Sequence, residues 1–403
     1  MKRFFKFFLK RSEILSVIGI IAEFNPLHTG HELLIKNAKE KGTTVAVISG
    51  NFVQRGDLAI LEKRIRAEAA LICGADLVLE LPVAYSMSTA QNFALGGVSA
   101  LKAVGCDALL FGSESGDTAE LKTACDILKT KEFSVLLNGY LATGMTFASA
   151  REKAACALGL KEGLLSGANN NLAVEYMTAA ENIGANFRFE TIKRQGASHD
   201  SDKVSGGYAS ASLLRKKLLE GDYNFCESYI PENVFSLLQS TDTADIRRIE
   251  NAILAVLRTR TLSELKNLPD ISEGLENKLF SAIRVAINLE DLYNRVKVKR
   301  YTLARIRRLV LSAFIGLDGT FFMKQPPYVR VLGFNERGMA LLKERSADSA
   351  IPVVTRVSEI KKLPEPAKKL FETECRATDL FSLALPKAAP CGLEYTAKII
   401  KTE

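Results

Sequence analysis

Residues 17–31 of the 403-residue chain read VIGIIAEFNPLHTGH, and this stretch decides the predicted fold. Its first seven residues are apolar almost throughout and rich in β-branched side chains, which is typical of a strand buried on both faces of a sheet. A polar loop with Pro26 and Gly30 follows, and a helical pattern runs from His31 to residue 41. This order of strand, loop and helix predicts one repeating unit of a parallel α/β sheet.

The same alternation continues along the chain. Further strands and helices are expected at residues 43–49, 61–73, 77–81, 90–104 and 108–111. This pattern predicts an α/β fold whose first domain is a Rossmann-like parallel sheet with helices on its faces. Such sheets bind ligands beyond the carboxyl ends of their strands, and polar loops do follow Glu23, Ser49 and Phe111. We therefore expect the functional site at this edge.

The strand pattern fades after about residue 215. Helices are expected at residues 213–219, 245–258, 275–293 and 301–315. Past residue 324, short strands at 328–333 and 351–355 flank a helix at 336–343. We therefore predict an N-terminal extension at 1–16, a sheet domain at 17–215, a helical domain at 216–324 and a small α/β C-terminal region at 325–403.

Histidine is rare, with three in the chain, and two of them lie in the loop after the first strand. His28 and His31 are spaced H-x-x-H around Gly30, at the start of a helix whose N–H groups and dipole favour anions. Two imidazoles there can stabilise charge that develops at a phosphate. A structural role is the alternative for a single histidine. A zinc site is disfavoured because no third ligand lies nearby and His199 is the only other imidazole.

Composition excludes several classes of protein. The chain is 47% apolar, 25% charged and 8% aromatic, so neither a disordered nor a fibrous protein is expected. The chain has no stretch of 18 uncharged apolar residues, so no membrane span is predicted. Residues 1–16 lack the apolar stretch of a signal peptide. We expect them to form a plain extension, and a helix on a membrane surface is the alternative. Seven scattered cysteines without a C-x-x-C pair predict a reduced, cytoplasmic protein.

Positive charge gathers in the second half. The formal net charge of +8 is divided as +4 in residues 1–16, −3 in 17–210 and +7 in 211–403. Residues 291–310 (DLYNRVKVKRYTLARIRRLV) hold seven basic residues against one acid, with apolar Leu303, Ile306 and Leu309 at helical spacing. We expect this segment to contact RNA phosphates, with Tyr301 stacking on a base; the alternative is a solvated helix face. The candidate RNA-binding residues are Lys297, Lys299, Arg300, Arg305 and Arg308.

The loop after the first strand resembles the H-x-G-H motif of the nucleotidyltransferase superfamily. An ordered set of further segments is similar to the bacterial tRNA(Met) cytidine acetate ligase family. They are AEFNPLHTGH (22–31), SGNFVQRGD (49–57), DLVLELP (76–82), FGSE (111–114), IKRQGASHD (192–200), SASLLR (210–215) and the K-R-Y-T element at 299–302. The resemblance identifies 17–215 as an ATP-binding, nucleotidyltransferase-like domain and 216–324 as a basic, tRNA-binding one.

The resemblance also implies which residues bind ATP. The family pattern P-N-N-x-L-G falls on ANNNLA, with Ala168 for Pro and Ala173 for Gly, so the contacting amide is either Asn169 or Asn170. Ser210, Ser212 and Arg215 correspond to the S-x-x-x-[IL]-R signature of the superfamily, and helix capping is the alternative role of the two serines. Gln54 and Arg55 are expected on the acyl or RNA side. His28 and His31 are the implied catalytic residues, and the implied ATP-binding residues are Ile21, Ala22, Glu23, Phe24, Asn25, Pro26, Leu27, His28, Thr29, Gly30, His31, Glu32, Leu33, Leu34, Gly112, Asn169, Asn170, Arg194, Ser210, Ser212 and Arg215.

The reaction that the resemblance implies has two steps. Acetate attacks the α-phosphorus of ATP to give acetyl-adenylate and pyrophosphate, and N4 of the wobble cytidine of elongator tRNA(Met) then takes the acetyl group. Mg²⁺ is expected on the nucleotide rather than on protein ligands, and neither an obligate protein partner nor a membrane is expected. The alternatives are a mononucleotide or pantetheine-phosphate adenylyltransferase and a non-catalytic RNA-binding protein.

Overall fold

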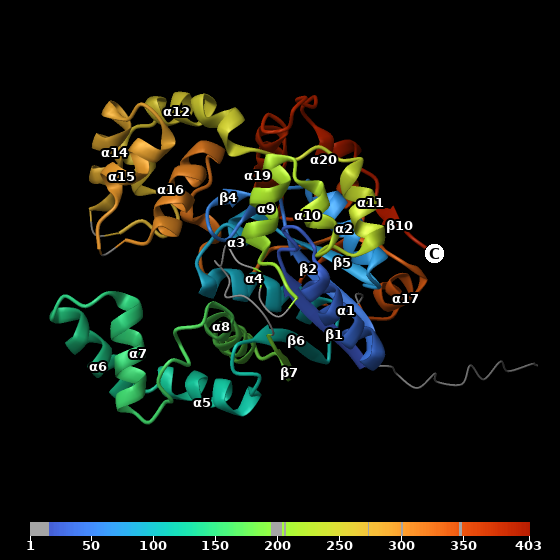
Figure 1. Cartoon of the computed structure of the whole chain (residues 1–403), viewed down its shortest axis with the longest axis horizontal. Coiled ribbons are helices and arrows are strands. Elements are labelled where there is room, and N and C mark those ends of the chain that lie inside the picture. The colour runs from blue at the N-terminus through green and yellow to red at the C-terminus, as the bar shows by residue number, and fades with distance from the viewer. Residues whose placement is uncertain (1–15, 195–203, 205–206, 273, 300, 346–348) are drawn as a thin grey trace, which may run out of the picture.

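The computed structural model describes residues 16–194, 204, 207–272, 274–299, 301–345 and 349–403. Its centre is a sheet with the strand order β10-β8-β5-β2-β1-β6-β7, in which β9 also pairs with β8 (Figure 1). A small hairpin of β3 (Phe52–Val53) and β4 (Asp57–Leu58) stands apart. The sheet strands are β1 (Ser16–Ala22), β2 (Gly42–Ser49), β5 (Leu77–Leu81), β6 (Ala108–Ser113), β7 (Arg188–Lys193), β8 (Val329–Phe334), β9 (Val353–Val354) and β10 (Ile400–Lys401).

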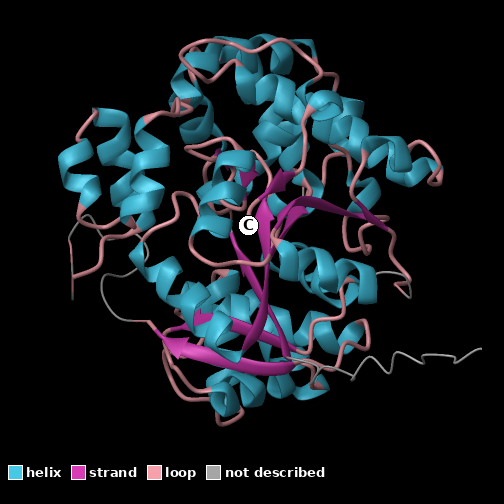
Figure 2. Ribbon diagram, turned by 90° about the vertical axis from the view of Figure 1, so that its right-hand side faces the viewer, coloured by secondary structure: helices cyan, strands magenta, loops and turns pink. Residues whose placement is uncertain are grey.

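Alternate residues of the central strands enter two different cores, so helices cover both faces of the sheet (Figure 2). In β2, Val45 and Val47 face one core, and Ala46 and Ile48 face the other. This is the period of two that a strand imposes. One core contains α1 (Thr29–Lys41), α2 (Lys63–Ile72), α9 (Ala211–Glu220), α10 (Tyr223–Glu227) and α11 (Glu232–Gln239). The other contains α3 (Val83–Ser86), α4 (Ala90–Ala103), α5 (Thr118–Leu128), α6 (Lys131–Ala142), α7 (Phe147–Ala157) and α8 (Ala168–Asn182).

The predicted α/β fold with a mostly parallel sheet is confirmed. The pairs of β1 with β2 and β6, of β2 with β5 and of β6 with β7 are all parallel. The C-terminal strands extend this same sheet, because β8 pairs with β5 in antiparallel register, from Leu77 opposite Phe334 to Glu80 opposite Arg330. Residues 325–403 are therefore joined to the sheet of residues 17–215 by backbone hydrogen bonds. The helices of this part are α17 (Glu336–Arg345), α18 (Val357–Ile360), α19 (Glu365–Ser382) and α20 (Leu393–Thr396).

A group of helices between the first and last parts of the chain lies at one side of the molecule (Figure 1). It consists of α12 (Glu250–Thr259), α13 (Leu262–Lys266), α14 (Leu275–Val285), α15 (Leu289–Val296) and α16 (Leu303–Ile315), after the 3-10 turn at Ile246–Ile249. The single helix expected over 275–293 is wrong: it divides into α14 and α15, because the Asn288 side chain accepts the Asp291 N–H and caps a new helix. The apolar residues of this group belong to the same core as Val45 and Val47 of β2. None of the described helices combines the length and apolar character that crossing a lipid bilayer needs.

A buried cluster of five charged residues connects the sheet to its C-terminal part. The Lys63 ammonium contacts Glu80, Glu394 and, at 3.7 Å, Glu374, while Arg330 contacts Glu80 at 3.5 Å and Glu394. Burial, together with Glu80, raises the pKa of Glu374 to about 8, whereas Lys63 and Arg330 overcome burial and hold the pKa of Glu394 at about 2. The charges of the cluster therefore nearly balance at neutral pH. The cluster joins α2, β5, β8, α19 and α20.

Candidate active site

The two histidines of the H-x-x-H loop lie against each other at the start of α1. Their rings are stacked with centroids 3.8 Å apart and an interplanar angle of 26°. His28 is the N-cap residue, and its Nδ1 accepts the Gly30 N–H at 3.1 Å. In a neutral ring the proton is then on Nε2, which makes this atom a hydrogen-bond donor. The pair thus places imidazole donors beside the N-terminal N–H groups of a helix, an arrangement suited to anions.

Two cavities meet at His31. A cavity of about 110 Å³ lies between the start of α1, the ends of β6 and β7, and residues 208–210. A second, of about 320 Å³, lies between the loop after β1, the β3–β4 hairpin, α8, α9 and α16. His31 and Arg194 line both cavities. We name them the histidine cavity and the hairpin cavity. The histidine cavity is lined by His28, Gly30, His31, Leu33, Leu34, Gly112, Ile192, Lys193, Arg194, Tyr208, Ala209 and Ser210.

Two arginines hold the loop between β1 and α1 in place. Arg66, which is fully buried, donates from Nη1 to the Glu23 carbonyl at 2.7 Å and also contacts the Gly50 carbonyl. Arg215 donates from Nη1 to the Asn25 carbonyl at 2.7 Å. Within this loop Phe24 adopts φ of +47°, a conformation that is unfavourable for a non-glycine residue. Such a residue persists only where its surroundings hold it, and here the arginines do so.

The segment predicted to bind ATP, residues 21–34, divides between the two cavities. Leu27 is buried in the core beneath α1, and Glu32 pairs with Lys36 on the surface. His28, Gly30, His31, Leu33 and Leu34 line the histidine cavity. Ile21, Glu23, Phe24, Asn25 and His31 line the hairpin cavity. The residues of the segment that line neither cavity are Ala22, Pro26, Leu27, Thr29 and Glu32.

The structure distinguishes the two asparagines, Asn169 and Asn170, that are candidates for the ATP contact. Asn170 is buried, and its Oδ1 accepts the N–H groups of Glu114 and Ser115 at 2.9 and 3.1 Å while Nδ2 donates to Leu164. Its side chain therefore orders the turn after β6. Asn169 lines the hairpin cavity and donates from Nδ2 to Glu114 at 2.7 Å. The geometry favours Asn169 as the ligand-facing amide.

The remaining predicted ATP-binding residues lie near the histidines. Gly112 in β6 is so close to Arg194 that an added Cβ would lie 3.3 Å from its Cγ. Ser210 caps α9 by accepting the Leu213 N–H at 3.1 Å, and its Oγ lies 3.0 Å from that of Ser212. Ser210 lines the histidine cavity, and Ser212 and Arg215 line the hairpin cavity. Ser210 therefore caps α9 and also lines the histidine cavity. His199 lies outside the described residues.

Two carboxylates belong to the hairpin cavity. Burial raises the pKa of Glu23, against the lowering effect of the Gln54 N–H, which donates to Oε1 at 2.8 Å, and of Arg215. Burial likewise raises the pKa of Asp57, against its bond with the Leu58 N–H. The cavity also contains the four guanidinium groups of Arg55, Arg194, Arg215 and Arg307. Its charged residues carry more positive than negative charge, which suits an anionic occupant.

The basic segment of residues 297–308 differs in part from the prediction. Of the expected packing face of α16, Ile306 and Leu309 are buried and Leu303 is half-buried. Arg305 and Arg308 do not project freely: both contact Asp270, at 3.5 and 3.2 Å between side chains. The base-stacking role of Tyr301 is wrong, because only 7% of this residue is exposed. Lys297 and Lys299 are exposed, and Arg300 lies outside the described residues.

Several cavity residues were not among the predicted ligands. Arg307 reaches the hairpin cavity from α16, and Tyr176 reaches it from α8. The close approach of α16 to the β3–β4 hairpin depends on Gly56, which has φ of +71°. A Cβ added at Gly56 would lie 2.5 Å from the backbone nitrogen of Arg308. The sequence did contain a signal for Arg307, because this residue lies next to Arg308 within the basic run of residues 291–310. A tyrosine on an apolar helix face carries no such signal.

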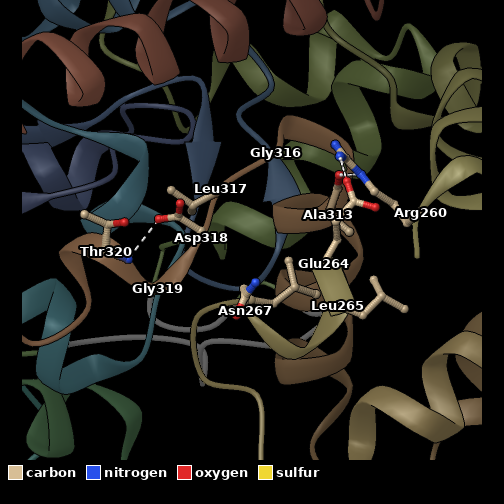
Figure 3. A pocket seen from close by; sticks show the side chains of 11 residues that line it. Arg260, Glu264, Leu265, Asn267, Ala313, Gly316, Leu317, Asp318, Gly319 and Thr320 are labelled. Atoms are coloured by element: carbon tan, nitrogen blue, oxygen red, sulfur yellow. Dashed lines mark hydrogen bonds and ion pairs between the residues drawn. The ribbon is translucent and has the colours of Figure 1, made fainter. Parts of the chain in front are cut away.

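A third hollow, of about 450 Å³, lies in the helical part, at the C-terminal end of α16 (Figure 3). Its charged groups are already paired with protein: Arg260 donates to Glu264 at 2.9 Å, and Asp318 accepts the Thr320 N–H at 2.9 Å. No histidine is among its lining residues. The histidine and hairpin cavities therefore remain the candidate active site.

The chain matches proteins that are named for one reaction. The family model described as HIGH Nucleotidyl Transferase matches residues 15–394. The tRNA(Met) cytidine acetate ligases of Thermoanaerobacter sp. (strain X514) and Clostridium novyi (strain NT) are 39% and 34% identical, over 96% and 92% of this chain and 100% and 95% of their own lengths. Two crystal structures of Thermotoga maritima TmcAL, one apo (form I) and one bound with alpha-thio ATP (form II), share 32% and 31% identity, with TM-scores of 0.90 and 0.87 and coverage of 96% of this chain and 99% of theirs. Agreement over nearly the whole length, including both halves of the site, shows that the chain belongs to the HIGH nucleotidyl transferase family and, within it, to the tRNA(Met) cytidine acetate ligases.

Proposed function

We propose that this enzyme activates acetate with ATP and transfers the acetyl group to N4 of the wobble cytidine of elongator tRNA(Met). Membership in a family of tRNA(Met) cytidine acetate ligases supports the overall reaction. The alpha-thio ATP bound to T. maritima TmcAL supports a nucleotide as one substrate. The assignment of roles to residues rests on one observation of geometry: the stacked His28 and His31 lie at a helix N-terminus where two cavities meet.

In the first step a carboxylate oxygen attacks the α-phosphorus, and pyrophosphate leaves. Little covalent help from protein is needed, but two anions must be brought together and the charge of the phosphorus centre must be stabilised. His28 and His31 donate to the α-phosphate, while Ser210, Ser212 and Arg215 at the start of α9 hold the outer phosphates. Arg194, which lines both cavities, neutralises charge between them.

Mg²⁺ would arrive on the nucleotide. The residues lining the histidine cavity include no carboxylate, so the protein atoms there suit phosphate rather than a directly bound metal. When bound, the ion would neutralise negative charge on the phosphates. The residues of this chain then orient the α-phosphate toward the carboxylate.

Acetate-dependent exchange of radiolabelled pyrophosphate into ATP is expected without tRNA. The reason is that the proposed adenylate-forming residues all precede residue 216 and need no RNA contact for their positions. The measurement is label recovered in ATP with acetate, with formate or propionate, and without a carboxylate. Adenylylation of a nucleoside monophosphate, with no exchange on any carboxylate, would instead identify a simple adenylyltransferase.

The variant K297A/K299A is expected to bind tRNA more weakly and with a shallower salt dependence. Both lysines are exposed, and each lost phosphate contact lowers the slope of log affinity against log salt by up to about one, less for single strands. We propose that they contact the tRNA together with Arg300, whereas Arg305 and Arg308 are already paired with Asp270 and would have to leave it to reach a phosphate. The measurement is tRNA affinity between about 50 and 200 mM salt.

The matched control for this prediction is K361A/K362A, which removes two exposed lysines from another part of the chain. If the control variant weakens tRNA binding as much as K297A/K299A does, only net charge matters and the assignment of this segment is wrong. Arg308 is less suitable for the test. Its Nη1 donates to the Gln54 carbonyl at 3.3 Å, so its removal also disturbs the hairpin beside the site.

A further inference from the structure

The hairpin cavity has the size and composition of a small-molecule site. Its volume of about 320 Å³ lies at the lower end of the range of roughly 300–1,000 Å³ for such sites. Apolar side chains from three parts of the chain line it, among them Val53, Phe93 and Leu172, beside the charged groups described above. It borders the histidine cavity at His31, so a group bound there lies next to the proposed position of the α-phosphate. Ser212 and Arg215, which we assign to the outer phosphates, also line the hairpin cavity, so the acceptor can enter it only after pyrophosphate has left.

Tyr176 gives independent evidence of a ligand. Only 2% of this residue is exposed, and its Oη has no hydrogen-bond partner among the described residues. A buried hydroxyl without a hydrogen-bond partner destabilises the folded state. Because Tyr176 lines the cavity, a bound polar atom can satisfy the hydroxyl. Burial and the neighbouring Glu23 carboxylate both raise the pKa of Tyr176, so the hydroxyl keeps its proton and remains a donor.

Glu23 stands at the boundary between β1 and the histidine loop. Its carbonyl is held by Arg66 and its Oε1 by the Gln54 N–H, so both ends of the residue are positioned by the protein. Burial raises its pKa above that of an ordinary glutamate, which makes the carboxylate a stronger base once it is ionised. Arg215 and Arg66 each lower its pKa and so limit this upward shift.

We propose that the hairpin cavity is the acyl-acceptor pocket, in which Glu23 accepts a proton from the attacking amine and Tyr176 donates a hydrogen bond to the pyrimidine base. This inference rests on the proposed function. The N4 lone pair forms a bond to the acetyl carbon of acetyl-adenylate, and the bond from that carbon to the phosphate oxygen breaks, so AMP leaves with the electron pair. One N4 proton passes to Oε2 of Glu23 and then to solvent. The products are the N4-acetylated base and AMP.

The test compares the two half-reactions in Glu23→Gln. Acetate-dependent pyrophosphate exchange measures the first step, and single-turnover transfer of labelled acetyl to tRNA measures the second. Removing a general base costs about 10²–10⁴-fold, so transfer is expected to fall at least tenfold more than exchange. The rise of the wild-type transfer rate with pH on its acid side is expected to disappear in the variant. The control is Glu190→Gln, a partly exposed carboxylate of β7 that pairs with Lys41 and Arg188 and lines neither cavity; this variant should change neither activity.

A purely structural role for Glu23 predicts a different result. The glutamine side chain retains an oxygen for the Gln54 N–H, so a structural role leaves both half-reactions and the pH profile of Glu23→Gln close to wild type. That result overturns the proposal. A wild-type enzyme without acetate-dependent exchange would instead overturn the proposed function, so the two failures are distinguishable.

Tyr176→Phe tests the second half of the proposal. Removing a buried hydroxyl that has no partner in the protein should not lower the melting temperature, but transfer to tRNA should fall about tenfold, mainly through the KM for tRNA. The control is Tyr85→Phe, which removes another buried hydroxyl without a partner among the described residues, in α3 and outside both cavities. Equal transfer by the two variants would show that Tyr176 does not contact the base.

Discussion

His31→Ala should lower the rate of acetyl-adenylate formation by about 10²-fold or more while the fold survives. His31 lines both cavities and stacks on His28, so its imidazole lies at the position that we propose for the attack on the α-phosphate. Its interaction strengthens as charge develops on the phosphate oxygens, so kcat should fall more than the affinity for ATP. The measurement is acetate-dependent pyrophosphate exchange at saturating ATP, together with thermal unfolding.

The choice of His31 over His28 follows from the structure. His28 caps α1 through the Gly30 N–H, so His28→Ala also removes a cap worth about 0.5–2 kcal/mol, and its loss of activity has two causes. Lys36→Ala, on the exposed face of the same helix, is the matched control and should retain activity. Near-normal exchange by a folded His28→Ala/His31→Ala double variant would contradict the assignment of both histidines.

Lys63→Met should destabilise the protein by about 3–5 kcal/mol. The ammonium of Lys63 is buried among Glu80, Glu374 and Glu394, and methionine leaves these carboxyl groups with Arg330 as their only cation within the cluster. The Lys63 backbone N–H also donates to the Asn51 side chain at 2.8 Å, and Asn51 in turn contacts Thr378 of α19. The loop after β2 should therefore loosen together with the C-terminal part.

The measurement is the urea dependence of unfolding, compared with that of Lys122→Met. Lys122 also has two carboxylate partners, Asp126 and Glu181, but its side chain is 46% exposed. A change of no more than about 0.5 kcal/mol is expected there, because solvent screens exposed ion pairs. If both variants lose the same free energy, the buried cluster has no special role in stability.

Local patterns were sufficient for the first part of the fold. β1, β2 and β5 lie within one residue of their predicted positions, and β6 extends two residues beyond its predicted end. A strand that is buried on both faces must be apolar along its whole length, and that requirement is visible in single short segments. The position of the histidine pair at a strand-to-helix turn follows for the same reason, because strand, loop and helix are consecutive.

Contacts between distant segments could not be predicted in this way. No helix or strand was predicted for residues 118–193, although this region forms α5 to α8 and β7. The antiparallel partner of β8 is β5, some 250 residues earlier. Many apolar segments can pair with a given strand, and only the packing of the whole chain selects one.

What the sequence by itself determined is the α/β class, the strands around β1, the helix start with its two histidines and the family to which these motifs belong. Each of these depends on residues close together in the chain. What only the tertiary structure decided is the surroundings of single side chains. Asp270, outside the basic run, pairs with both Arg305 and Arg308, and Tyr176 and Arg307 converge with Glu23 on one cavity from three separate segments. Ion pairing and burial depend on which groups come within a few ångströms in space. For these residues that distance is set by the packing of α8 against β6 and of α16 against the β3–β4 hairpin and the neighbouring helices.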